Sequence, residues 1–354
     1  MSRALPGFFC AFTLACTCSP WGTALEGSAD SGRTDGGEAG AGASAPCTTG
    51  PMGPGSVVGT GLDTPRRLAT DGVHLYFTLA GLPTQPSGRV VRVLLLGGLV
   101  EPVTDGLTAP DALAVDATDV YVLDADGVWR APKSGGSKVF LASVLSNSRF
   151  GGTTLMVAGE ALVVAAGFQY LLRLEKDGTS PVELFAAEAG ALVRSPVIEG
   201  NKVFFLLAGG SANGIYEVLL DGSAPATRVL FEPSADGRGL HLTPTRFVWT
   251  ERGGGAGRVC SADRTGGTPV VHASELLEPT HPVVVGEFIY FKDSTAGTGT
   301  SDRFFQRVQT CSSPGTSEPV GPQGVGPGDL LFVDGVLFFT SSDSSPLGYV
   351  GRVP

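Results

Sequence analysis

A pair of apolar or aromatic residues recurs along this chain about every 42 residues, and this repeat constrains the fold more than any other feature. The first members of successive pairs are 45, 42, 41, 44, 42 and 48 residues apart. Strand-like segments and Gly-containing turns follow most pairs. Units of this length with four short strands are typical of β-propeller blades, because a small sheet with two apolar faces needs a neighbour on each side. The pairs are Tyr76-Phe77, Tyr121-Val122, Val163-Val164, Phe204-Phe205, Val248-Trp249, Tyr290-Phe291 and Phe338-Phe339.

Composition supports an all-β chain. Of 354 residues, 52 are Gly and 25 are Pro, while only 16% are charged and 42% are hydrophobic. Frequent Gly and Pro exclude long helices and coiled coils, and low charge with high hydrophobicity excludes a disordered chain. Turn residues in this excess fit many short strands joined by tight turns.

The repeat count predicts how the ring closes. The last repeat ends at residues 348–354, after its third strand, and residues 56–61 (SVVGTG) form a short apolar stretch before the first complete repeat. If this stretch pairs with the last repeat, no sheet edge is left open. We therefore predict an all-β, seven-bladed propeller over residues 56–354, with four antiparallel strands per blade and the last blade closed by an N-terminal strand. Six blades are the alternative, because the third repeat (LVVAAG) is weak.

The repeats also resemble a known family. The four residues beginning at each pair read YFTL, YVLD, VWTE, YFKD and FFTS in five repeats, and RVVRVLLLGG and GIYEVLLDG follow two pairs. These motifs resemble the YWTD-type propeller repeat of low-density-lipoprotein-receptor-like proteins and the bacterial, exported lipoprotein relatives of that family. The resemblance covers about residues 56–354 and implies extracellular protein binding. Because the receptor propellers have six blades, it supports the blade type rather than a shared partner.

The N-terminus is typical of an export signal. Arg3 gives a short positive start, and an apolar stretch covers residues 5–15. We predict a signal peptide over residues 1–24, with a lipobox-like sequence and lipidation at Cys16, and a flexible Gly/Ala/Ser-rich tether over residues 25–55. An outer-membrane or periplasmic lipoprotein is the first expectation, and a secreted protein without a lipid is the alternative.

Charge and cysteines limit the partners. The formal net charge is −10, which argues against binding nucleic acid, because such proteins neutralise phosphates with a basic excess. No apolar run reaches the roughly 18 residues of a membrane span, so membrane contact is expected only through a lipid anchor. The protein is expected to be a monomer. Export permits disulfides, and Cys260 and Cys311 fall at similar points of neighbouring repeats. A bridge between them is possible, and two separate thiols are the alternative.

Arginines recur where the innermost strand of a blade is expected to begin. Prolines mark this position in several repeats, and three of the seven repeats place an arginine there. Guanidinium groups suit carboxylates and phosphates, so we expect a rim that binds a protein, an anion or a saccharide. Three arginines exposed to solvent, one of them paired with an aspartate, are the alternative. The rim candidates are Arg66, Asp111, Arg194, Arg238, His281 and Asp329.

Motifs for catalysis are missing from the sequence. There is no GxSxG sequence, P-loop or pair of histidines at metal-binding spacing, and DADG at residues 124–127 is interpreted as a hairpin turn rather than a calcium loop. No cofactor is predicted, and a calcium ion bound in the channel is not excluded. The first hypothesis is a non-enzymatic binding or scaffolding propeller at the bacterial cell envelope. The alternative is an ion-assisted, lactonase-like hydrolase or lyase with its site in the central channel.

Overall fold

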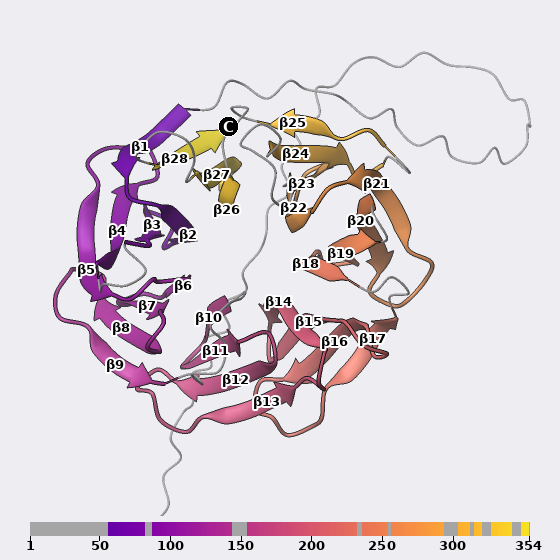
Figure 1. Ribbon diagram of the computed structural model, residues 1–354, viewed down its shortest axis with the longest axis horizontal. Coiled ribbons are helices and arrows are strands. Elements are labelled where there is room, and N and C mark those ends of the chain that lie inside the picture. Colours follow the sequence, from indigo (N-terminus) through magenta and orange to yellow (C-terminus); the bar gives the residue numbers. More distant parts are fainter. Residues whose placement is uncertain are drawn as a thin grey trace, which may run out of the picture. The chain divides into compact units, whose positions relative to one another are not determined.

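The computed structural model describes residues 56–81, 87–143, 154–231, 236–253, 256–293, 304–311, 315–320, 327–341 and 348–353. These residues form 28 strands in seven four-stranded antiparallel sheets, which are arranged in a ring (Figure 1). The chain is a seven-bladed β-propeller, as predicted, and the six-bladed alternative is wrong. The predicted signal peptide, the predicted tether and Cys16 lie outside the described residues.

The first three blades follow one another in the sequence, and each begins with its innermost strand. Blade 1 contains β2 (Pro65–Thr70), β3 (His74–Leu79), β4 (Gly88–Leu94) and β5 (Glu101–Leu107). Blade 2 contains β6 (Ala112–Val115), β7 (Asp119–Leu123), β8 (Val128–Pro132) and β9 (Val139–Ala142). Blade 3 contains β10 (Thr154–Ala158), β11 (Ala161–Ala166), β12 (Tyr170–Glu175) and β13 (Val182–Ala186).

The next three blades repeat this order. Blade 4 contains β14 (Leu192–Glu199), β15 (Lys202–Ala208), β16 (Gly214–Leu219) and β17 (Thr227–Phe231). Blade 5 contains β18 (Gly237–Leu242), β19 (Arg246–Gly253), β20 (Ala256–Asp263) and β21 (Val270–Leu276). Blade 6 contains β22 (Thr280–Val285), β23 (Phe288–Asp293), β24 (Phe304–Gln309) and β25 (Glu318–Val320).

Blade 7 is made from both ends of the described chain. Its first three strands are β26 (Pro327–Val333), β27 (Val336–Ser341) and β28 (Gly348–Val353), and its outermost strand is β1 (Ser56–Leu62). Strand β1 pairs antiparallel with β28, so that Ser56 lies opposite Arg352 and Leu62 opposite Gly348. The predicted closure by residues 56–61 is therefore confirmed.

The hydrophobic core consists of seven clusters, each between two adjacent sheets. The recurring residue pairs explain this arrangement, because successive side chains on a strand point to opposite faces of the sheet. On β3, Tyr76 packs toward blade 2 and Phe77 toward blade 7. On β15, Phe204 packs toward blade 5 and Phe205 toward blade 3. Each pair thus contributes to two core clusters, because both faces of the second strand of a blade pack against a neighbouring blade.

The possible bridge between Cys260 and Cys311 is not formed in the structure, because Cys260 is not part of a disulfide. Cys260 lies in the middle of β20, opposite Trp249, and only 2% of it is exposed. The equivalent residue of the next blade is Gln306, opposite Phe291, five positions before Cys311. The two cysteines therefore occupy different levels of their blades: Cys260 is buried between sheets, and Cys311 is exposed in the turn after β24.

Candidate functional site

The seven innermost strands begin at the same end of the ring, because every blade repeats the same strand order and direction. We call this end of the central channel the mouth. In five of the seven blades, the pairing of the innermost strand shifts near its start. Such a β-bulge adds a residue and turns a side chain away from the regular alternation, as is common at barrel rims and functional sites. The shifts lie in β2, β14, β18, β22 and β26.

Threonines from the adjacent strand fasten two of these bulges. The Thr78 hydroxyl accepts a hydrogen bond from the Arg67 backbone N–H at 3.1 Å. The Thr340 hydroxyl accepts from the Asp329 N–H at 2.8 Å and donates to the Arg66 carbonyl at 2.7 Å. Both threonines are fully buried. The third position of the YFTL and FFTS motifs thus holds the backbone that presents the mouth side chains.

A first cluster at the mouth joins blades 1 and 2; we call it the blade 1/2 cluster, made of Arg66, Arg67 and Asp111. The Asp111 carboxylate lies 3.9 Å from Arg66 Nη1 and 3.6 Å from Arg67 Nη2. Arg67 Nε also donates to the Asp111 backbone carbonyl at 2.6 Å. Two guanidinium groups therefore share one carboxylate, which leaves the cluster with one excess positive charge.

A second cluster joins blades 4 and 5; we call it the blade 4/5 cluster, made of Arg194, Arg238 and Asp236. The two Asp236 oxygens lie 3.5 Å from Arg194 Nη1 and 2.7 Å from Arg238 Nη2. The Ser195 hydroxyl, in the bulge of β14 with φ 45°, donates to the Arg238 carbonyl at 3.1 Å and links the two strands. The charge pattern is that of the first cluster, two guanidinium groups around one carboxylate.

Arg194 carries a charge that its surroundings compensate incompletely. Its side chain is only 12% exposed, and burial lowers its pKa, as does repulsion from Arg238, against the attraction of Asp236 and Glu278. The Nε atoms of Arg194 and Arg238 are both buried without a hydrogen-bond partner among the described residues. Buried donors without an acceptor cost free energy, on the order of 1–3 kcal/mol each, so an incoming anion would find groups that gain by binding it.

His281 and Asp329 form a third contact at the mouth, between blades 6 and 7. His281 Nε2 lies 3.8 Å from Asp329 Oδ1, and His281 has φ 52° in the bulge of β22. Burial lowers the pKa of His281, against the attraction of Asp329, and Arg67 and Lys292 lower it further. Asp329 is also fixed by the backbone, because its Oδ2 accepts from the Leu68 N–H at 2.9 Å. This aspartate therefore also fastens blade 7 to blade 1.

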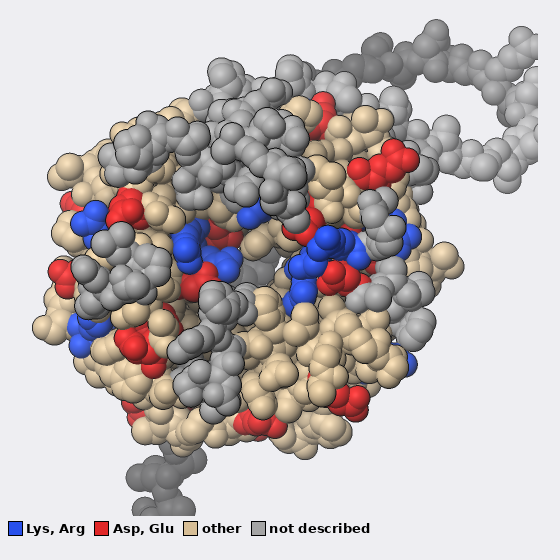
Figure 2. Space-filling model, in the orientation of Figure 1, with Lys and Arg blue, Asp and Glu red and all other residues tan. Residues whose placement is uncertain are grey.

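All six predicted rim residues lie at the mouth, but they do not form one group. Arg66 and Asp111 meet, as do Arg194 and Arg238, and His281 and Asp329. Strands β2 and β6 lie across the opening from β14 and β18 (Figure 1), and basic and acidic side chains gather on two sides of the opening (Figure 2). Arg67 and Asp236 also lie at the mouth but were not predicted from the sequence, although each lies within two residues of a predicted arginine.

Metal binding finds no support in the part of the chain that the structure describes. No three His, Cys, Asp or Glu side chains among those residues are grouped so that they could hold an ion. In the DADG sequence, Asp124 Oδ1 accepts hydrogen bonds from the Asp126 and Gly127 N–H groups and from Trp129 Nε1, which is a turn. The same described residues include no helix with the length and apolarity needed to cross a membrane.

No family model and no curated protein matches this chain. Solved structures do. YCF48 from Cyanidioschyzon merolae superposes with a TM-score of 0.58 at 11% identity, covering 85% of this chain and 98% of that one. An oligogalacturonate lyase in complex with manganese gives 0.57 at 14% identity, covering 86% and 97%. BamB from Moraxella catarrhalis gives 0.52 at 12% identity, covering 84% and 85%. Likeness at this identity shows the propeller fold alone.

Proposed function

We propose that this chain is a binding propeller that takes an anionic ligand at the mouth of its channel. The observation that carries the proposal is the blade 4/5 cluster, in which Arg194 and Arg238 share one carboxylate and keep their Nε donors buried and unpaired among the described residues. Charge-assisted hydrogen bonds to a carboxylate or phosphate would satisfy these donors. The blade 1/2 cluster offers the same excess of one positive charge on the other side of the opening.

Similar folds support a binding role. One of the similar structures is that of YCF48 bound to a D1 peptide, and it superposes with a TM-score of 0.56 at 12% identity. A peptide carries carboxylates in its acidic side chains and its C-terminus, so an acidic segment of a protein fits the mouth chemically. The YWTD-type repeat resemblance points to protein binding as well. The ion-assisted lyase is the second candidate, and only the likeness to the oligogalacturonate lyase favours it.

The test is a titration with a pentaglutamate peptide and with citrate, followed by calorimetry at low and at moderate salt. The double variant R194Q/R238Q should weaken binding about tenfold or more, because each lost charge-assisted hydrogen bond is worth about 1.5–3 kcal/mol. The matched control is R246Q, an arginine of the same blade at the far end of the sheet. Equal affinity of R194Q/R238Q and the unchanged protein, or no binding of either probe at millimolar concentration, would overturn the proposal.

We also propose the location. The export signal over residues 1–24, the lipobox-like Cys16 and the tether over residues 25–55 favour an outer-membrane or periplasmic lipoprotein in a bacterial envelope. A lipid of two or more acyl chains on Cys16 would hold the propeller stably at a membrane. Mass spectrometry of the mature protein, purified from its native envelope, tests this. A mature chain that begins after Ala24 and carries no lipid mass would contradict the anchor.

A further inference from the structure

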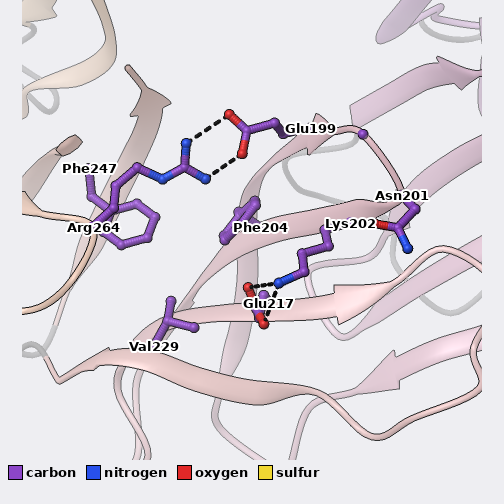
Figure 3. Close-up of a pocket in the computed structure, with 9 residues that line it drawn as sticks. Glu199, Asn201, Lys202, Phe204, Glu217, Val229, Phe247 and Arg264 are labelled. Atoms are coloured by element: carbon purple, nitrogen blue, oxygen red, sulfur yellow. Dashed lines mark hydrogen bonds and ion pairs between the residues drawn. The ribbon is translucent and has the colours of Figure 1, made fainter. Parts of the chain in front are cut away.

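A cleft lies between blades 4 and 5, at the end of the sheets opposite to the mouth. It has a volume of about 400 Å³ and is lined by the turn between β14 and β15, by β15, β16, β17 and β19, and by Arg264 directly after β20 (Figure 3). This volume is in the range of natural small-molecule sites. We call it the seam cleft, and its polar lining residues are Glu199, Asn201, Lys202, Glu217 and Arg264.

At two other seams, as we call the contacts between neighbouring blades, a different group of side chains fills this place. Between blades 1 and 2, the Tyr76 hydroxyl donates to Asp71 at 3.0 Å, and Lys133 Nζ lies 2.6 Å from the same carboxylate oxygen and over the Tyr76 ring. The next seam repeats the arrangement with Asp116, Tyr121 and Lys176. At both seams an aspartate, a tyrosine hydroxyl and a lysine meet in one compact group.

The seam cleft forms where this group is altered. Phe204 replaces the tyrosine and brings no hydroxyl, and Glu199 and Arg264 replace the aspartate and the lysine. Arg264 lies over the Phe204 ring at 5.0 Å and holds Glu199 at the outside through both of its terminal nitrogens, with Nη1 to Oε1 at 2.7 Å. The three residues all line the cleft, so the space opens beside the altered group.

Charge in the cleft is balanced pairwise. Lys202 Nζ donates to both oxygens of Glu217 at 2.9 Å, and Arg264 pairs with Glu199. A charged ligand would have to compete with one of these ion pairs, whereas a neutral ligand can use the lone pairs and N–H groups that remain. Asn201 adds one amide donor and one amide acceptor at the same rim, and Phe204 and Val229 supply an apolar side (Figure 3).

We infer that the seam cleft binds a neutral, polyhydroxylated ligand of about one sugar ring. Vicinal hydroxyls both donate and accept, which matches carboxylates, an amide and cationic N–H groups at one rim. The C–H face of such a ring is apolar and fits against Phe204 and Val229. The inference is independent of the anionic ligand at the mouth, because it uses other residues at the other end of the sheets.

The experiment titrates the full chain with neutral methyl hexosides, and with glucuronate and glucosamine as charged probes, observed by ligand-detected NMR. We expect at least one neutral glycoside to bind with a dissociation constant of the order of 1 mM, and more tightly than both charged probes. V229F, which fills the cleft from the bulged residue of β17, should weaken binding at least tenfold. N201A should weaken it about fivefold through a lost hydrogen bond.

Two controls separate this result from a folding defect and from the mouth. L141F places the same bulk at the equivalent bulged residue of β9, and V73A alters the residue that corresponds to Asn201 in blade 1; both should bind like the unchanged protein. R194Q/R238Q should also bind the glycoside unchanged. No binding of any neutral glycoside, preference for a charged probe, or equal loss in V229F and L141F would overturn the inference.

Discussion

At the scale of single residues, the group of Asp71, Tyr76 and Lys133 shows how one tyrosine links two blades. Tyr76 is fully buried, yet its hydroxyl reaches the carboxylate at the edge of the seam. Burial raises the pKa of Tyr76, and the hydrogen bond to Asp71 adds to this effect. The first residue of the YFTL motif therefore does more than fill the core, since it also orients a carboxylate for the lysine of the next blade.

The two aspartates of these groups should make the fold sensitive to acid. Burial alone would raise the pKa of Asp71 and of Asp116, but hydrogen bonds from a lysine, from two backbone amides and from a tyrosine outweigh it and hold both values well below 3.8. A carboxyl group whose pKa is lower in the folded than in the unfolded state stabilises the fold at pH values above the unfolded-state pKa. This stabilisation is lost as the pH falls from the unfolded-state pKa toward the folded-state pKa. D71N/D116N should therefore be about 2–5 kcal/mol less stable at pH 7 and depend less on pH below about 4.

Urea unfolding at pH 7, 4 and 3 measures this difference. The control is D105N, an exposed aspartate of β5, which should follow the unchanged protein at each pH. If D71N/D116N kept the full acid sensitivity of the unchanged protein, the stabilising role of the two carboxylates would be wrong.

At the scale of the element, glycines and prolines join neighbouring blades. Gly88 begins β4 and packs on Pro110, which precedes β6 of the next blade, and a Cβ added at Gly88 would overlap with that ring. The same contact joins Gly257 to Pro279. Between blades 7 and 1, where the ring closes, Gly348 packs on Pro65 in the same way. The prolines noticed at the starts of innermost strands thus have a packing partner, which is a glycine because no side chain fits.

G257A should destabilise the protein by about 1–3 kcal/mol, because an extra methyl group in a packed seam forces a shift of the backbone. The second substitution P279A removes the ring that the methyl group meets. G257A/P279A should therefore recover part of the loss, and a double-mutant cycle in urea unfolding gives the coupling. Purely additive effects of the two substitutions would show that the contact is not the cause.

Strand positions were predictable from the sequence, whereas the contacts of the mouth were only partly so. Apolar pairs such as Tyr76-Phe77 mark the second strand of every blade, because both neighbours in the pair must be buried. Register is not visible in the same way. The bulge in β2 adds a residue, so Arg67 joins Arg66 at the mouth. Asp236, the residue before β18, places its side chain between Arg194 and Arg238. The misaligned Cys260 and Cys311 show the same limit, since the repeats vary in length between their strands.

At the scale of the whole molecule, the pairing of β1 with β28 completes blade 7 with a strand from the start of the propeller. It adds to the direct contacts between blades 7 and 1, such as the hydrogen bonds of Asp329 with Leu68 and of Thr340 with Arg66. Val58 and Leu62 of β1 are buried in the cluster between blades 7 and 1. Without this strand, β28 would become an open sheet edge, which invites pairing with other chains. Seven sheets around one channel leave no other strand of the described chain to take its place.

A chain that begins at Asp63 should therefore lose at least about 3–6 kcal/mol from the two buried side chains alone, and should associate through its open edge. A chain that begins at Ser56 is the matched control and should retain the thermal midpoint of the full chain. Thermal unfolding and light scattering distinguish the two. Equal midpoints for both truncated chains would contradict the closing role of β1.

The pairing of β1 with β28 also determines how the ring responds to a pulling force. The two strands run antiparallel, and Ser56 at the start of one lies opposite Arg352 near the end of the other. A force applied between the two ends of the propeller therefore loads the first hydrogen bonds of this pair before the rest, and they break one after another instead of sharing the load. The propeller should open at a low force by peeling of a single strand, while the other six sheets remain folded until the force reaches them in turn.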